Sequence, residues 1–151
     1  MKLKFDFSKI PTKCSNCGSD LIRYTTNDEI YGKLYGNGGC YVCDWCGAYV
    51  GVHNTKDKIP LGRFADKELR DLKMQCHNIF DKFWKKEKLS RRDCYGYLAH
   101  KLDLYVRETH LGWFDKEYLL KALDILKETT TKDILIYIRD REIRKSKEQG
   151  L

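Results

Sequence analysis

The sequence lacks the apolar stretches that take a chain into or across a membrane. Its first residues contain no apolar core of a signal peptide, and no run of about 18 apolar residues occurs anywhere in the chain. Low-complexity tracts are absent, and so are internal repeats apart from one doubled cysteine motif. We therefore expect a globular protein of the cytoplasm that has no membrane partner.

The motifs of common enzyme families are also missing. The sequence contains no HExxH, no GxSxG nucleophile motif and no phosphate-binding P-loop, and it has no paired carboxylates at helical spacing. Catalysis therefore ranks last among the functions considered. We expect neither an enzyme nor catalytic residues.

What the sequence does contain is cysteine, in a pattern typical of a metal site. Seven cysteines cannot all pair with one another, and clustered cysteines in a reducing compartment are usually metal ligands. Two Cys-x-x-Cys turns, each followed by a glycine that permits a positive φ, are separated by 25 residues. Structural Zn²⁺ sites favour four such ligands in a tetrahedron. We predict one structural zinc ion, held by Cys14, Cys17, Cys43 and Cys46.

The other three cysteines need a different interpretation. Cys40 stands three residues before Cys43 and is a competing ligand, but only the Cys43–Cys46 pair repeats the following glycine of the first turn. We interpret Cys40 as a neighbour of the site. Cys76 and Cys94 fall on apolar faces of predicted helices, where cysteine is usually a small core residue.

The local patterns predict an α+β fold. We expect an N-terminal zinc ribbon of short antiparallel strands in residues 1–62, packed on three or four helices in residues 63–151 as one compact unit. Alternating apolar residues predict a strand at Leu3–Phe7. Further strands are expected beside the cysteine turns, the last of them at Ala48–Val52.

Apolar residues spaced by three or four positions predict three helices, capped by Asp66, Ser90 and Asp115. The run Ile134–Ile138 suits a strand or a helix, and the charged residues that follow it favour a helix. The predicted apolar faces comprise Leu69, Leu72, Cys76, Ile79 and Phe83 in the first helix, Cys94, Leu98 and Leu102 in the second, and Leu119, Ala122, Leu123 and Leu126 in the third.

The net charge of +7 is concentrated in the middle of the chain. Residues 63–102 carry 11 basic and 6 acidic side chains, whereas four zinc-bound thiolates would cancel the small positive excess of residues 1–62. The basic stretch from Lys82 to Arg92 fits contact with nucleic acid or with an acidic protein surface, but it also fits a solvated helix end. We predict partner contacts at Lys82, Trp84, Lys85, Lys86, Lys88, Arg91, Arg92 and Trp113.

Three histidines suggest a second metal site. His53 follows a predicted strand, His77 lies in the first predicted helix and His110 lies in a loop, so the fold could bring the three together. The alternative is that each histidine satisfies a local backbone group.

Six segments together resemble a phage-type family of zinc-finger-containing proteins of unknown function. They run in order from about Cys14 to Leu126 as CSNCG, NDEIYGKLYG, AYVGVH, PLGRFADKEL, HNIFDKFW and HLGWFD. The family often has a cysteine where this chain has Val52, and Cys40 looks like an addition. The resemblance implies a zinc-binding module of bacteriophages and mobile elements. It does not imply an enzymatic activity, because none is established for the family.

From this setting we expect an accessory protein in the cytoplasm of a bacterial host. The first hypothesis is that it binds and inhibits a host defence nucleoprotein, specifically as an anti-CRISPR inhibitor of Cas9. Because Cas9 holds nucleic acid in basic channels, a basic inhibitor would have to contact an acidic patch. The alternatives are a nucleic-acid-binding zinc ribbon and a metal-dependent nuclease with a second, open metal site.

Overall fold

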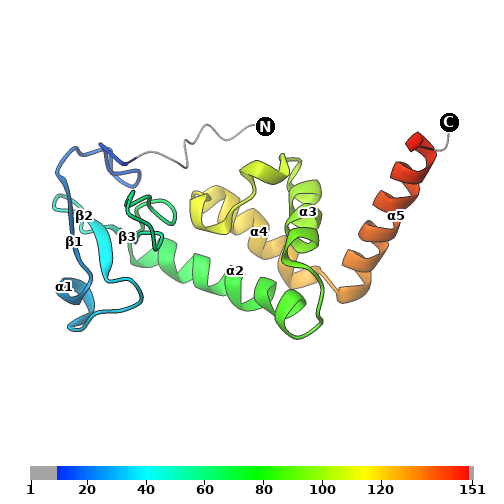
Figure 1. The fold of residues 1–151 in the computed structure, drawn as a ribbon, viewed down its shortest axis with the longest axis horizontal. Coiled ribbons are helices and arrows are strands. Elements are labelled where there is room, and N and C mark those ends of the chain that lie inside the picture. The colour runs from blue at the N-terminus through cyan, green and yellow to red at the C-terminus, as the bar shows by residue number, and fades with distance from the viewer. Residues whose placement is uncertain (1–9, 150–151) are drawn as a thin grey trace. The chain divides into compact units, whose positions relative to one another are not determined.

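The chain forms two compact units, which are described separately (Figure 1). The structure is a computed structural model that describes residues 10–149, so the strand expected at Leu3–Phe7 lies outside the described residues. The zinc-ribbon unit comprises residues 10–71 and 112–115, and the helical unit comprises residues 72–111 and 116–149. The division between the two units falls within the helix Lys67–Lys85, whereas the sequence suggested a boundary after residue 62.

The zinc-ribbon unit is built on a three-stranded antiparallel sheet. Strands β1 (Ile22–Thr26), β2 (Gly39–Cys43) and β3 (Tyr49–Gly51) lie in the sheet in the order of the sequence. Ile22, at the start of β1, pairs with Cys43, at the end of β2. This register brings the turn before β1 and the turn after β2 to the same end of the sheet.

One face of the sheet carries a small apolar core. Successive residues of a strand point to opposite faces, so Tyr41 and Cys43 share the core face of β2, while Cys40 points to the other face. The core cluster of this unit consists of Cys14, Tyr41, Cys43, Ala48, Val50, Val52 and Phe64.

The connection between β1 and β2 is closed by a buried asparagine. It contains the short helix α1 (Asp28–Tyr31), which ends at Gly32 in the left-handed region with a φ of 77°. The side chain of Asn27 donates a hydrogen bond to the Tyr35 carbonyl (2.8 Å) and accepts one from the Tyr35 N–H (3.0 Å). These two bonds fix the loop that carries the exposed side chains of Tyr31 and Tyr35.

The segment Gly112–Asp115 belongs to the zinc-ribbon unit although it lies far along the chain. The Arg63 N–H donates a hydrogen bond to the Gly112 carbonyl (3.0 Å), and a Cβ atom at Gly62 would collide with the same carbonyl oxygen. Position 62 therefore needs a glycine, because two backbones meet there.

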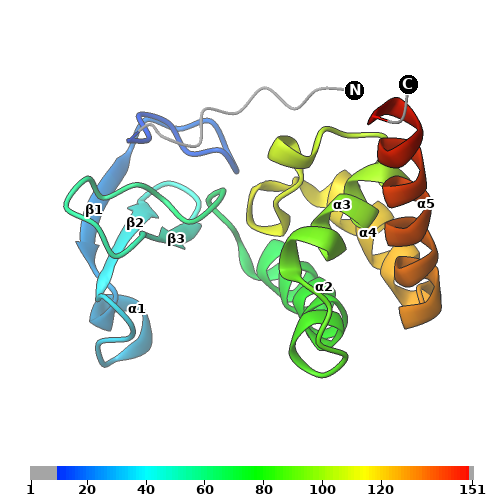
Figure 2. The ribbon, with the colours of Figure 1, turned by 45° about the vertical axis from the view of Figure 1, so that its right-hand side comes forward.

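Four helices form most of the remainder of the described chain (Figure 2). Helix α2 (Lys67–Lys85) begins in the zinc-ribbon unit and continues into the helical unit. It is followed by α3 (Arg91–Leu102), α4 (Lys116–Glu128) and α5 (Thr131–Gln149), with 3₁₀ turns η1 (Val106–Glu108) and η2 (Leu111–Trp113) between α3 and α4. None of the helices in residues 10–149 is both long and apolar enough to span a membrane.

Two of the three predicted side-chain caps, Asp66 and Ser90, are confirmed, while the cap predicted at Asp115 stays a prediction. The Asp66 carboxylate accepts a hydrogen bond from the Leu69 N–H (2.9 Å), and the Ser90 hydroxyl accepts one from the Asp93 N–H (3.0 Å). A reciprocal pair of bonds between Thr130 and Asp133 starts α5. The last segment is thus a helix, and the α+β fold class is confirmed.

The core of the helical unit differs from the predicted stripe at one position of α2. Ile79 is only half-buried, whereas its neighbour Phe80 is fully buried against the ring of Tyr95, with the ring centroids 4.5 Å apart. The periodicity of one helix carries no information about packing between helices. Contact with Tyr95 of α3 is what selects Phe80 rather than Ile79 for the core. The buried residues of this unit include Cys76, Phe80, Phe83, Cys94, Tyr97, Leu98, Leu111, Leu119, Ala122, Leu123, Leu126 and Ile134.

Candidate metal centre

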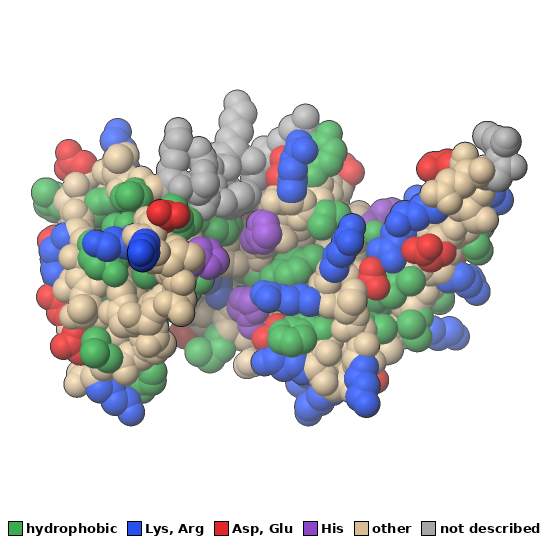
Figure 3. Space-filling model, in the orientation of Figure 1, with side chains coloured by type: hydrophobic (Ala, Val, Ile, Leu, Met, Phe, Trp, Pro, Cys, Tyr) green, Lys and Arg blue, Asp and Glu red, His purple; other side chains and the backbone are tan. Residues whose placement is uncertain are grey.

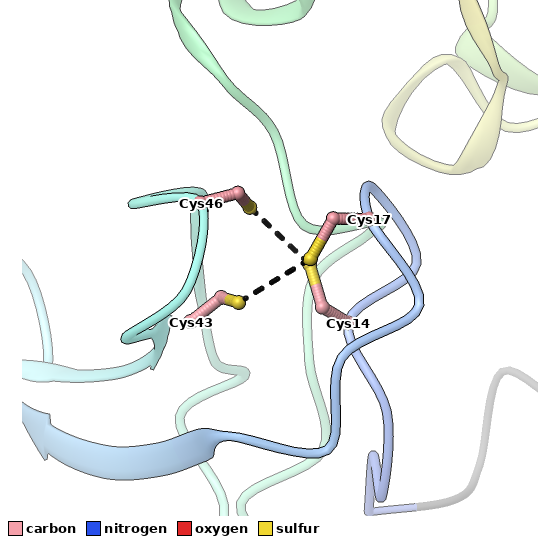
Figure 4. Close-up of side chains that lie close together, drawn as sticks. All are labelled: Cys14, Cys17, Cys43 and Cys46. Atoms are coloured by element: carbon pink, nitrogen blue, oxygen red, sulfur yellow. Dashed lines mark hydrogen bonds between the residues drawn. The ribbon is translucent and has the colours of Figure 1, made fainter.

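The four predicted zinc ligands converge at one end of the sheet. Figure 4 shows their side chains pointing toward one another from two separate turns. The Sγ atoms of Cys14 and Cys46 are 3.7 Å apart, those of Cys17 and Cys43 are 3.6 Å apart, and all four lie within 4.8 Å of one another. Zn–S bonds of about 2.3 Å in a regular tetrahedron require sulfur atoms about 3.8 Å apart. The four thiols therefore form a site of the size and donor type that Zn²⁺ needs.

The two cysteine turns share one backbone geometry. In the first, the Gly18 N–H donates to the Cys14 carbonyl (2.7 Å), and in the second, the Gly47 N–H donates to the Cys43 carbonyl (2.9 Å). Both glycines are left-handed, with φ of 82° and 78°. The glycine that follows each pair is thus explained by this turn, as the sequence predicted.

Hydrogen bonds to sulfur support the second turn. Cys46 Sγ accepts bonds from the Asn16 side-chain amide and from the Ala48 N–H, each at 3.5 Å. Desolvation would raise the pKa of Cys46, but these bonds and the neighbouring Cys17 and Cys14 thiols lower it to about 7. Burial raises the pKa of Cys14 to about 12. Zinc binding must therefore displace protons, and at neutral pH Cys46 ionises more easily than Cys14.

The exposure of the ligands differs within each pair. The first cysteine of each turn, Cys14 and Cys43, is buried, whereas the second, Cys17 and Cys46, reaches the surface. A hydrogen bond from the Phe64 N–H to the Ser15 hydroxyl (2.9 Å) ties the first turn to the core of the unit. The centre thus has a covered side and an open side.

The remaining cysteines lie away from this group. Cys40 is buried on the opposite face of β2 and is not among the four clustered sulfurs. Cys76 and Cys94 are buried in α2 and α3, and burial raises the pKa of each thiol to about 11. Their environments are those of core residues.

The histidines have contacts of their own. His77 Nδ1 lies 3.7 Å from the Asp81 carboxylate, and the ring of His110 lies 6.1 Å from that of Tyr95, both within the helical unit. His53 belongs to the zinc-ribbon unit. In the part of the chain that the structure describes, the only group of three or more His, Cys, Asp or Glu side chains close enough to share a metal is the four-cysteine group. A second site shared by the three histidines stays a prediction.

Part of the basic stretch is held by its own neighbours. The guanidinium of Arg91 lies over the rings of Trp84 and Tyr95, at 5.6 and 5.7 Å from their centroids. The Trp84 indole N–H donates to the Asp81 carboxylate (3.0 Å), which also faces the Lys85 ammonium at 3.9 Å. These contacts explain why Arg91 is tolerated at the start of α3. The exposed cations of the stretch are Lys82, Lys85, Lys86, Lys88, Arg91 and Arg92.

Among residues 10–149, the most exposed aromatic side chain is one that sequence reasoning missed. Trp45, between ligands Cys43 and Cys46, has 73% of its surface exposed, whereas the predicted contacts Trp84 and Trp113 are both half-buried. The signal was present in the sequence. Trp45 lies within a short Cys-x-x-Cys turn, and a turn of that length has little room to bury so large a ring.

Comparison with known proteins identifies a family for this chain. A family model described as a zinc-finger-containing domain matches residues 10–129, which include both cysteine turns and helices α2 to α4. No curated protein and no solved structure matches the chain.

Proposed function

Because the chain belongs to this family of zinc-finger-containing domains, we propose that it is a zinc-stabilised binding protein whose zinc-ribbon unit docks on a protein partner, and that it is not an enzyme. The observation that carries the proposal is Trp45. Tryptophan and tyrosine are enriched among the few residues that contribute most of the binding energy of protein interfaces. Here the tryptophan sits on a turn that the metal would hold rigid.

A second feature of the same unit supports the proposal. The loop closed by Asn27 presents Tyr31, Leu34 and Tyr35 to solvent, and Tyr35 is 50% exposed. The rings of Tyr31 and Tyr35 pack edge to face, with centroids 5.0 Å apart. Because the loop is already ordered, binding through it would cost little conformational entropy.

The charges of the unit favour a protein over nucleic acid. Arg23 is neutralised by Glu29 (2.9 Å) and Asp44 (3.0 Å), and four zinc-bound thiolates add negative charge beside Trp45. Single-stranded nucleic acid needs aromatic rings inside a positive groove. Figure 3 shows the Lys and Arg side chains at several separate places, over the zinc-ribbon elements as well as over the helices, rather than in one groove. Nucleic-acid binding therefore has less support than protein binding.

The proposal has a narrower form, in which the partner is a host defence nucleoprotein and the chain inhibits it, as an anti-CRISPR protein inhibits Cas9. What supports this form is the phage setting that the family resemblance implies. It predicts that the purified chain slows DNA cleavage by a guide-loaded Cas9 and that the Trp45→Ala variant loses this effect.

The wider proposal is tested by capture from a bacterial host lysate, with and without nuclease treatment. We expect a protein that is retained after nuclease treatment and whose retention is lost with Trp45→Ala. The matched control is Met74→Ala, which removes an exposed apolar side chain from the helical unit. Retention that depends on intact nucleic acid, or that is equal for both variants, contradicts the proposal.

A further inference from the structure

The two units carry opposite charge, which the overall charge of +7 conceals. In residues 10–149, the zinc-ribbon unit has 8 basic and 9 acidic side chains, and the helical unit has 18 basic and 12 acidic side chains. A Zn²⁺ ion with four thiolates adds −2 to the ribbon. The metal-loaded ribbon therefore has a charge of −3 and the helical unit one of +6. A partner that docks on the ribbon meets the opposite sign from the one that the whole chain suggests.

Part of the negative charge lies next to Trp45 in the sequence and in the fold. The carboxylate of Asp44 accepts a hydrogen bond from Arg23 Nε (3.0 Å), and the same guanidinium pairs with Glu29 (2.9 Å). One cation thus lies between two carboxylates, so this trio keeps a charge of −1. The three side chains are 42% to 50% exposed. The zinc-bound thiolates of the same turn add to the negative charge.

Apolar surface lies at the same place. Trp45 is 73% exposed and Leu21 is 53% exposed. The Asp44 N–H donates a hydrogen bond to the Leu21 carbonyl (2.8 Å), which fixes Leu21 beside the turn that carries the tryptophan. A tryptophan ring next to apolar surface is the kind of side chain that anchors a protein interface.

An indole ring with carboxylates beside it suits one side chain above the others, which is arginine. The ring face attracts a cation, the carboxylates accept the N–H groups of a guanidinium, and arginine does both better than lysine because its charge is planar and weakly hydrated. The unit already contains such stacking elsewhere. The Arg70 guanidinium lies 4.1 Å from the centroid of the Tyr49 ring.

We propose that the surface formed by Leu21, Arg23, Glu29, Asp44 and Trp45, here called the Trp45 surface, binds a protein surface rich in arginine. This inference rests on the proposed function and names the chemistry of its partner. An arginine of the partner stacks on the indole ring, and further arginines pair with the two carboxylates. Phosphate groups and acidic protein surfaces are repelled from the same place.

The direct test uses a fluorescein-labelled oligoarginine peptide as the probe. Fluorescence anisotropy measures its binding to the full-length, zinc-loaded protein. We expect binding although both molecules have a positive net charge. Trp45→Ala should weaken it about tenfold and Asp44→Lys about fivefold, because one removes the ring and the other reverses a charge of the trio. A peptide that does not bind, or that binds Trp45→Ala as well as the wild type, overturns the proposal.

Matched variants separate the Trp45 surface from net charge and from folding. Asp124→Lys makes the same change of charge at an exposed position of α4 and should bind the peptide like the wild type. Equal weakening by Asp124→Lys and Asp44→Lys would show an effect of net charge alone and overturns the proposal. Glu29→Lys reverses the other carboxylate from α1, outside the cysteine turns, and should also weaken binding about fivefold. Elemental analysis checks that each variant keeps the zinc content of the wild type.

Capture from a nuclease-treated host lysate separates this inference from the proposed function. We expect the retained protein to be displaced by the oligoarginine peptide and to be lost with Asp44→Lys as well as with Trp45→Ala. Retention that depends on Trp45 but resists both the peptide and Asp44→Lys leaves the proposed function standing and overturns the inference. Retention that is equal for Trp45→Ala and the wild type contradicts the proposed function, and this inference with it.

Discussion

The zinc-ribbon unit and the helical unit differ in what fills their interiors. In residues 10–149, the fully buried large side chains of the helical unit include Phe80, Leu98, Leu111 and Leu119, while Phe114 is the one that belongs to the zinc-ribbon unit. The ribbon's sheet instead covers a small cluster that includes two zinc ligands. We therefore expect the zinc-ribbon unit to depend on its metal for folding, whereas the helical unit can rely on packing.

Removing a zinc ligand is the strongest way to test this difference. Cys43→Ser should abolish zinc binding and unfold the zinc-ribbon unit, because metal binding in small zinc modules contributes on the order of 10 kcal/mol to folding. Elemental analysis gives the zinc content, and amide NMR shows which unit unfolds. We expect the signals of α3 to α5 to remain dispersed.

Two matched variants complete this experiment. Cys40→Ser should keep one zinc per chain, because Cys40 lies on the other face of β2. Full zinc content in a Cys14→Ser, Cys17→Ser double variant would rule out the four-thiolate site. Two zinc ions in the wild type, with one lost in His77→Ala or His110→Ala, would establish the second site instead.

A cavity in the core of the helical unit should destabilise that unit and leave zinc binding unaffected. Leu119 is fully buried in α4, so Leu119→Ala should lower the free energy of unfolding of the helical unit by about 2–5 kcal/mol and leave the zinc content unchanged. Chemical denaturation monitored by circular dichroism measures the change. The adjacent Leu120→Ala, at an exposed position, should change stability by less than about 0.5 kcal/mol. Equal effects at the two positions would show that α4 packs differently.

The contact between α3 and α5 is expected to matter less. Alanine in place of a helical glycine normally stabilises by about 1 kcal/mol, but at Gly96 its Cβ would press on the Tyr137 hydroxyl. We expect Gly96→Ala to be neutral or destabilising in the wild type, and stabilising by about 1 kcal/mol in a Tyr137→Phe background. Thermal unfolding of the four proteins checks this, and the same effect in both backgrounds would refute the contact.

The smallest expected effect is a pH dependence at Asp93. Partial burial would raise the pKa of this carboxyl, but hydrogen bonds from Arg141 and Ser90 outweigh it and hold the pKa below its usual value. A carboxyl with a lowered folded pKa stabilises the protein above its unfolded pKa of about 4, and this stabilisation is lost as the pH falls through the folded pKa. The contribution of the Asp93 carboxylate to the free energy of unfolding should be about 1 kcal/mol or less. Stability curves between pH 7 and pH 3 should be flatter for Asp93→Asn, and parallel curves would contradict the assignment.

The sequence was sufficient where local chemistry decides the structure. The ligand set follows from spacing and from two glycines, and the caps at Asp66 and Ser90 follow from residue type alone. The family resemblance is confirmed over residues 10–129. The helix at Thr131–Gln149 could be predicted because its charged half is incompatible with a buried strand.

What the sequence could not show depends on contacts between distant segments. The burial of Phe80 in place of Ile79 is set by Tyr95, which is on another helix. The return of Gly112 to the zinc-ribbon unit includes a hydrogen bond from Arg63 and requires the absence of a side chain at Gly62. The same lack of long-range information explains why the sequence suggested a boundary at residue 62, and why it did not show which side of α5 is exposed.

The unequal exposure of the zinc ligands determines how the centre can be attacked. An oxidant or a chelator meets the sulfur atoms of Cys17 and Cys46 first, because Cys14 and Cys43 are covered. Those two accessible sulfurs come from different turns and lie within 4.8 Å of each other. A two-electron oxidation that joins them in a disulfide would release the metal and yet keep the two turns linked. Damage to the centre would then be reversible by a cellular thiol reductant, with the zinc ligands still in place to bind the ion again.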